Sequence, residues 1–271
     1  MALGTSEGLV LFGLDFGPAT GGEHELRVEG AATTFAPVRL HARTRLAPLE
    51  GGTFPPAPLP LLLAPRSVEV EVDLAFRPVG PAVDFSLLLT AAEREAVRPL
   101  GDHHIEQAGT FEGKVTIGDR TYDVAGTGSR DHSWGSRDWS AYDHSHLFLA
   151  RFDDDVVLHA LTAVANGHLV EGGFLWRGGQ VERVTGILYA AERTEGRLRS
   201  LELEVRSASG PPLVLKGTVE RTLVVPVQID RRPSRHVVGR PYALLLHENF
   251  VRWEGLGRVG QGVAELSERP R

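Results

Sequence analysis

One window of the sequence, residues 126–146, gathers side chains that could do acid–base chemistry. It holds three Asp, three His, two Trp and one Tyr among small residues. Carboxyl and imidazole groups transfer protons, while indole and phenol rings line apolar pockets and offer one hydrogen bond. A carboxyl held against such rings resists ionisation and becomes a general acid, whereas pairing with Arg130 or Arg137 has the opposite effect. Two interpretations stay open: an acid–base site, or buried Arg–Asp pairs that brace a domain junction.

The geometry of this window follows if residues 130–134 are extended. Alternation then places Asp131 and Ser133 on one face and His132 and Trp134 on the other, and we expect one face to line a cavity. Three glycines in the window predict a strand with a bulge or tight bend rather than a regular ladder. They are Gly126, Gly128 and Gly135.

Paired histidines raise the question of a metal. His144 and His146 have the His-x-His spacing of a cupin-type site and share one strand face. The Glu that would complete the pattern is absent, since Ala150 stands there. We therefore expect half-buried pocket histidines, no bound metal and no cofactor. His103 and His104 are expected in a polar loop, and reach the site only if the fold brings them there.

The elements that must position these residues are strands. Apolar and acidic residues alternate from Ser67 to Phe76, and turn residues recur every ten to fifteen positions or so, as in an antiparallel meander. A short helix is predicted only at residues 91–97. Further strands are expected at 146–152, 156–163, 201–205, 213–219 and 242–253.

Length and composition favour an all-β fold of antiparallel β-barrels or sandwiches, arranged as one large domain or as two of ordinary size in tandem. The chain has 271 residues, with 31 Gly and 17 Pro. Every Trp and Tyr lies at or beyond Tyr122. This break predicts an N-terminal β domain at 1–124, either complete or reduced, and a C-terminal β domain at 125–271 that holds the ligand site.

Composition also excludes several functions. A net charge of -6 with scattered basic residues argues against nucleic-acid binding, and the absence of Cys removes disulfides, thiolate metal sites and cysteine nucleophiles. The pattern Gly255-x-Gly257-x-x-Gly260 predicts a glycine-rich hairpin, because the chain ends too soon for a dinucleotide fold. Without a signal peptide or a long apolar run, we expect a cytoplasmic protein with no transmembrane segment.

The run Asp131-His132-Ser133-Trp134-Gly135 resembles the Asp-His-Gln-Trp-Gly signature of the carotenoid 1,2-hydratase (hydroxyneurosporene synthase)-like superfamily, which includes lipocalin-like Diels–Alderases. Residues 247–266 resemble the closing hairpin of its C-terminal domain. The resemblance implies two lipocalin-like domains and non-redox chemistry, such as hydration, cyclisation or pericyclic ring closure. The chain departs from the family in having Ser133 at the Gln or Glu position and no Trp or Tyr in residues 1–121.

The same resemblance assigns roles to residues. Asp131 would donate a proton and His132 would polarise or orient it. Aromatic walls would stabilise a cation on the substrate by about 0.5 to 2 kcal/mol per ring. The residues expected to bind substrate are Trp134, Trp139, Tyr142, His144, His146 and Arg130.

These observations lead to one main functional hypothesis and two alternatives. The main hypothesis is a cofactor-independent lyase or isomerase that hydrates or cyclises an apolar terpenoid, polyene or polyketide-like substrate in a β-barrel pocket. The first alternative is a non-catalytic carrier of a lipid or isoprenoid, since lipocalin-like cavities hold such molecules unchanged. The second is a structural or partner-binding protein. The expected partner is one small apolar molecule, and the oligomeric state is left open.

Overall fold

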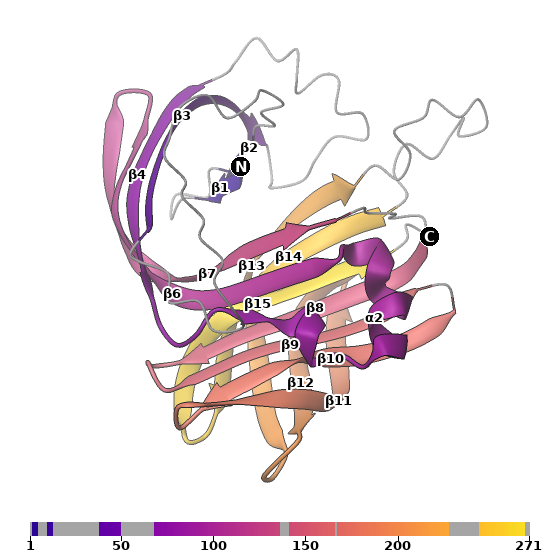
Figure 1. Cartoon of the computed structure of the whole chain (residues 1–271). Coiled ribbons are helices and arrows are strands. Elements are labelled where there is room, and N and C mark those ends of the chain that lie inside the picture. The colour runs from indigo at the N-terminus through magenta and orange to yellow at the C-terminus, as the bar shows by residue number, and fades with distance from the viewer. Residues whose placement is uncertain are drawn as a thin grey trace, which may run out of the picture.

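The structure, a computed structural model, describes residues 2–4, 10–12, 38–49, 68–135, 141–165, 167–227 and 244–268. These residues form a seven-stranded antiparallel sheet followed by a closed eight-stranded barrel (Figure 1). The predicted all-β class is confirmed. The helices among the described residues are short, and none is long and apolar enough to span a membrane.

The first sheet has the strand order β1-β2-β3-β4-β6-β5, with β7 also paired to β6. Its strands are β1 (Ala2–Gly4), β2 (Val10–Phe12), β3 (Val38–Leu49), β4 (Val68–Pro78), β5 (Val83–Asp84), β6 (His103–Ile117) and β7 (Arg120–Trp134). The predicted alternation in β4 buries Val70, Val72 and Phe76. Between β5 and β6 lie η2 (Phe85–Leu88), the predicted helix α2 (Ala91–Val97) and η3 (Arg98–Leu100). A capping box between Thr90 and Glu93 starts α2.

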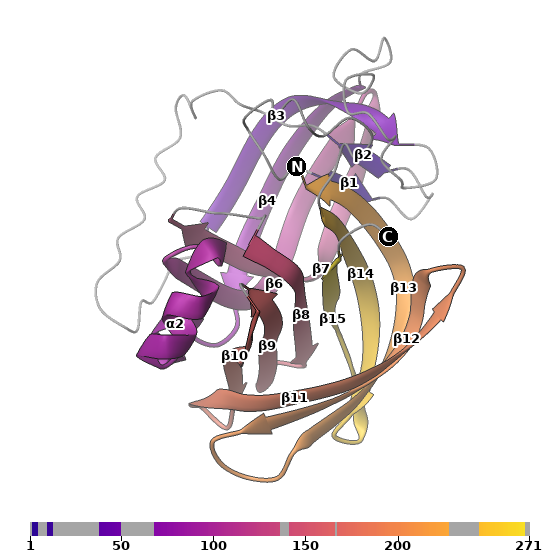
Figure 2. The same cartoon turned by 90° about the vertical axis from the view of Figure 1, so that its right-hand side faces the viewer.

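The barrel is a meander in which each strand pairs with the next and β15 closes onto β8 (Figure 2). Its strands are β8 (Tyr142–Phe152), β9 (Val156–Ala165), β10 (His168–Arg177), β11 (Gln180–Thr194), β12 (Arg197–Ser207), β13 (Leu213–Val227), β14 (Leu244–Gly255) and β15 (Arg258–Glu268). An eight-stranded up-and-down barrel is the lipocalin-like architecture, whose interior is filled by side chains or holds one small ligand.

Apolar side chains fill one part of the barrel interior. Trp253, Phe148 and Phe152 are fully buried there with leucines from β9, β10, β12 and β13. The indole Nε1 of Trp253 donates a hydrogen bond of 2.8 Å to the carbonyl of Leu149, which ties β14 to β8 across β15. This packed region forms an apolar floor beneath the polar residues described below.

The first sheet packs on the outside of the barrel. Arg151 Nη1 donates to the carbonyl of Gly109 at 2.8 Å, and Thr127 Oγ1 donates to Gln261 Oε1 at 2.9 Å. Strand β9 lies between the barrel interior and the sheet, which explains why residues 156–163 are buried on both faces rather than alternating. A second apolar cluster, including Phe85, Leu161 and Phe174, fills this junction.

The bulge or tight bend predicted for residues 126–135 is absent from β7 between Arg120 and Trp134. The strand pairs with β6 in continuous register from Arg120 to Trp134, with no register shift. The glycine at position 128 serves side-chain packing, because a Cβ there would come within 2.6 Å of the Phe111 ring. His103 and His104 lie in β6, so the expected polar loop is also wrong: both are paired with β7.

The predicted division between residues 124 and 125 falls inside β7, which belongs to the first sheet. The barrel begins at Tyr142. The compositional break marks the start of the aromatic-rich segment and not the end of the sheet. We keep the two-domain organisation as a proposal, with the boundary between β7 and β8.

Candidate functional site

Two clusters of polar side chains lie on opposite faces of the barrel wall. The lumen cluster, inside the barrel, consists of His144, His146, Tyr189, Arg193 and Glu268. The interface cluster, between the sheet and the barrel, consists of His104, Glu106, Asp131 and His159. Alternation along each strand separates them: His146 and Phe148 face inward on β8, while Leu147 packs in the junction with the sheet.

Contacts in the lumen cluster cross the barrel. Strands β8 and β15 are neighbours, whereas β11 lies three strands away from β8 and four away from β15 in the closed order. A hydrogen bond nevertheless joins Tyr189 Oη on β11 to His146 Nδ1 on β8 at 2.6 Å, and Arg193 on β11 forms an ion pair with Glu268 on β15. These side chains therefore meet within the interior.

The lumen cluster forms a short chain of groups. His146 Nε2 lies 3.8 Å from Glu268 Oε1, so Tyr189, His146 and Glu268 follow one another. The His144 ring stacks on His146 with centroids 4.8 Å apart, and Phe148 packs against Tyr189. The side chains of Arg193 and Glu268 are 31% and 36% exposed, because they lie at the ends of β11 and β15, at the rim of the barrel.

Burial keeps the central pair of the lumen cluster uncharged. Burial lowers the pKa of His146 to about 3, assisted by the nearby positive charges of His144 and Arg193. Burial also raises the pKa of Tyr189, as does the charge of Glu268. At neutral pH the pair is therefore a neutral imidazole bonded to a neutral phenol.

The depressed pKa of His146 predicts a pH-dependent stability. The folded protein favours the neutral form of His146 more than the unfolded chain does. The contribution of this group to the free energy of unfolding is therefore fully present above pH 6.5 and is lost as the pH falls toward about 3. The loss amounts to roughly 5 kcal/mol at the acid end. In urea unfolding across this range, His146→Gln should lack this part of the slope, while the exposed control His168→Gln should keep it. Equal slopes in the wild type and His146→Gln would contradict the prediction.

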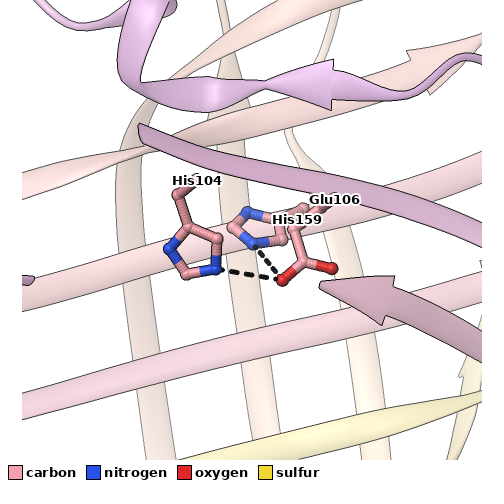
Figure 3. A group of neighbouring side chains, drawn as sticks. All are labelled: His104, Glu106 and His159. Atoms are coloured by element: carbon pink, nitrogen blue, oxygen red, sulfur yellow. Dashed lines mark hydrogen bonds and ion pairs between the residues drawn. The ribbon is translucent and has the colours of Figure 1, made fainter. Parts of the chain in front are cut away.

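The interface cluster joins β6 and β7 of the sheet to β9 of the barrel, and Figure 3 shows its members on β6 and β9. His104 and Glu106 stand two residues apart on β6 and share a face, and Asp131 is the partner of Glu106 on β7. His104 Nε2 lies 3.2 Å from Glu106 Oε1 and 3.1 Å from Asp131 Oδ2. The same Glu106 oxygen lies 3.6 Å from Nε2 of His159 on β9.

Aromatic rings hold the interface histidines in place. Phe85 packs on His104 and His159 with centroids 4.8 and 4.9 Å away, and Phe174 stacks parallel to His159 at 5.4 Å. The side chains of His159 and Glu106 are only 1% and 4% exposed. These two residues also line a pocket between the sheet and β8–β10.

Carboxylates dominate the electrostatics of the interface. Burial opposes the charged form of His104, but hydrogen bonds and charge from Asp131 and Glu106 outweigh it and raise the pKa to about 9. Glu248 and Glu265 are paired across β14 and β15, and the negative charge of Glu106 raises the pKa of both. Burial and their mutual repulsion raise the pKa of Glu265 well above its usual value, and burial raises that of Glu248.

The residues predicted from the sequence are distributed over several places. Asp131 and Ser133 share one face of β7 and His132 and Trp134 the other, as predicted. The imidazole that contacts Asp131 is therefore that of His104, and the Asp131 side chain is 49% exposed. Trp134 is partly exposed and stacks on His103.

The predicted substrate-binding residues are only partly brought together. His144 and His146 meet in the lumen, on the other side of the barrel wall from Asp131. Tyr142 is fully buried at the start of β8, and Arg130 is half-buried on β7. Trp139 lies outside the described residues.

Sequence reasoning missed Glu106, His159, Tyr189 and Glu268. The spacing of His104 and Glu106 could have signalled a shared strand face. His159 and Glu268 carry no local signal, because their partners come from distant strands. Tyr189 belonged to the aromatic-rich half, but nothing in the sequence paired it with His146.

Fold and site together define a lipocalin-like all-β barrel protein with buried proton-bearing groups inside and outside its barrel. The chain belongs to the family described as Domain of unknown function (DUF7064), which matches residues 16–270. No protein with a curated description matches it significantly.

Several solved structures are similar in part. A Nitrosomonas europaea protein provisionally named AttH is 15% identical, with a TM-score of 0.47 over 76% of this chain and 65% of that one. Kievitone hydratase from Nectria haematococca is 11% identical, with a TM-score of 0.43 over 73% and 60%. CghA in complex with Sch210972 is 13% identical, with a TM-score of 0.46 over 84% and 64%. The chain thus spans less than two thirds of the length of these proteins.

Proposed function

We propose that the protein is a cofactor-independent lyase or isomerase that hydrates or cyclises an apolar substrate held in the barrel. One observation carries the proposal: Tyr189, His146 and Glu268 form a chain of groups across the lumen, above an apolar floor. A barrel interior suits an apolar molecule, and a buried neutral phenol beside a neutral imidazole suits proton transfer. The motif resemblance at residues 131–135 agrees with this class of reaction.

The chemistry of this chain of groups narrows the substrate. A phenol with a raised pKa is too weak an acid to protonate an isolated alkene, but it is a strong hydrogen-bond donor to an oxygen that gains charge. Among the terpenoid, polyene and polyketide-like candidates, a polyketide-like conjugated carbonyl compound fits best. Such a substrate would place its carbonyl oxygen at Tyr189 Oη and its apolar part elsewhere in the lumen.

Each group then has a role. Tyr189 turns its single proton from His146 toward the substrate carbonyl, and His146, as the tautomer protonated on Nδ1, donates to the Tyr189 oxygen. Arg193 forms an ion pair with Glu268 beside the imidazole. In hydration, the oxygen of water bonds to the β carbon, one of its protons ends on the α carbon, and the other stays on the new hydroxyl. In cyclisation, Tyr189 polarises the carbonyl while the ring closes. Neither reaction needs an oxidant or reductant.

The remaining predicted residues enter as proposals. Catalysis by Asp131 and His132 stays a prediction from the motif, as does substrate binding by Trp134, Trp139, Tyr142 and Arg130. His144 is proposed to contact substrate from its position against His146. We also propose that the protein acts in the cytoplasm on one small apolar partner.

The experiment begins with the untagged protein. Native mass spectrometry and solvent extraction identify any compound retained from the expression host, and this compound joins a panel of conjugated carbonyl, terpenoid and polyene substrates. Turnover in D2O is followed by chromatography and mass spectrometry, so that a hydration product carries carbon-bound deuterium. Wild type, His146→Gln and Asp131→Asn are compared.

The variants separate the competing assignments. We expect product from the wild type and a loss of at least about 100-fold in His146→Gln. If Asp131→Asn loses turnover while His146→Gln keeps it, the chemistry belongs to the interface and the lumen assignment is wrong. If the protein binds a compound that it never converts, the carrier alternative replaces the enzyme.

A further inference from the structure

The interface cluster contains a feature that the proposed reaction does not use. His159 is almost completely buried, yet among the described residues neither of its ring nitrogens has a hydrogen-bond partner, and Glu106 Oε2 is also buried without one there. Leaving such groups unsatisfied lowers the stability of the fold, and more so for a charged group. Something that binds nitrogen and carboxylate oxygen would remove this cost.

We propose that His104, Glu106 and His159 bind a divalent transition-metal ion that fastens the first sheet to the barrel. The three residues offer one ligand atom each, and these atoms lie within 4.8 Å of one another (Figure 3). Two of the contacts, at 3.2 and 3.6 Å, match the separation of neighbouring ligands around an ion bound at about 2.0 to 2.2 Å.

The donor set indicates the type of ion. Two imidazoles and a carboxylate suit zinc, and also iron(II), cobalt(II) and nickel(II), whereas calcium and magnesium prefer oxygen alone. The Asp131 oxygen, 3.1 Å from His104 Nε2, stands beside the three as a further carboxylate.

The fold supplies rigidity and access. Phe85 and Phe174 fix the ring planes of the histidines, which is the role of outer residues in metal sites. The pocket lined by Glu106 and His159 lies directly beside two of the three ligands. Because the ligands come from β6 and β9, the ion would link the sheet to the barrel, and its site is separate from the lumen.

This inference departs from the sequence analysis, which expected no metal and considered only the pair His144 and His146. It goes beyond the proposed function, because it concerns a different face of the barrel wall. Metal binding can also be measured without a substrate. A failure of either proposal therefore leaves the other testable.

The test uses untagged protein freed of metal with a chelator and then dialysed. Calorimetric titration with zinc chloride should give one equivalent per chain, zinc should raise the melting temperature, and cobalt(II) should develop visible absorption. Glu106→Gln and His159→Gln should weaken zinc binding at least tenfold. His104→Gln, which replaces a more exposed ligand, gives a second measurement if the buried variants fail to fold.

Two control variants locate the ion. His168→Gln, on the exposed part of β10, and His146→Gln, in the lumen, should bind zinc as the wild type does. Absence of zinc binding in the wild type would overturn the proposal. Binding that survives substitution of His104, Glu106 and His159 would overturn it as well, because the ion would then lie elsewhere.

Discussion

Replacing Tyr189 with Phe should lower turnover by about 100- to 10,000-fold while leaving substrate affinity within a few-fold of the wild type. The substitution removes the hydroxyl bonded to His146 and keeps the ring that packs on Phe148. Rate constants from substrate titrations would separate the two effects, since a group that acts mainly in the transition state lowers kcat more than it raises KM.

Tyr122→Phe is the matched control for this change. Tyr122 is half-buried in the first sheet and packs on its core, so loss of its hydroxyl should leave the rate unchanged. A Tyr189→Phe enzyme as fast as the wild type would remove Tyr189 from the chemistry. An equal loss in both variants would indicate a general effect on the fold.

Replacing Trp253 with Ala should lower the free energy of unfolding by about 3 to 5 kcal/mol. The indole is fully buried in the barrel, and its Nε1 satisfies the carbonyl of Leu149 across β15. The substitution opens a cavity and removes the indole hydrogen bond to Leu149, which adds to the cost. Chemical denaturation, with the midpoint and slope measured together, gives the change in stability.

Trp253→Phe separates the loss of the hydrogen bond from the loss of ring packing. Phe keeps much of the buried ring but cannot donate to Leu149, so we expect a loss of only about 1 to 3 kcal/mol. A Trp253→Ala protein within about 1 kcal/mol of the wild type would mean that the apolar floor does not depend on this side chain. The packing described for the barrel interior would then be incorrect.

The strands and the helix were predictable because their signals are local. The alternation at Val70 and Val72 and the helical segment at 91–97 depend on neighbours within a few residues. The faces of β7 were also predictable, because alternation fixes which side chains share a side. The bulge was mispredicted because the glycine at position 128 makes room for Phe111, a reason that needs the partner strand.

The candidate sites were only partly predictable because they depend on contacts between distant segments. Period-two patterns show that His104 and Glu106 share a face, but not that His159 on β9 lies opposite them. Likewise, the position of Tyr189 against His146 follows from closure of the barrel, which brings β11 across from β8. Asp131 was found from its motif, whereas its partner His104 could be found only from strand pairing.

The most direct measurement for the central claim is a crystal structure of the wild-type protein with the compound retained from the host or converted in the turnover assay. The account predicts that this compound lies inside the barrel on the apolar floor, with a polar atom within hydrogen-bond distance of Tyr189 Oη. Density for the compound in the pocket between the sheet and the barrel, against Glu106, would contradict the lumen assignment and return the chemistry to Asp131 and His104.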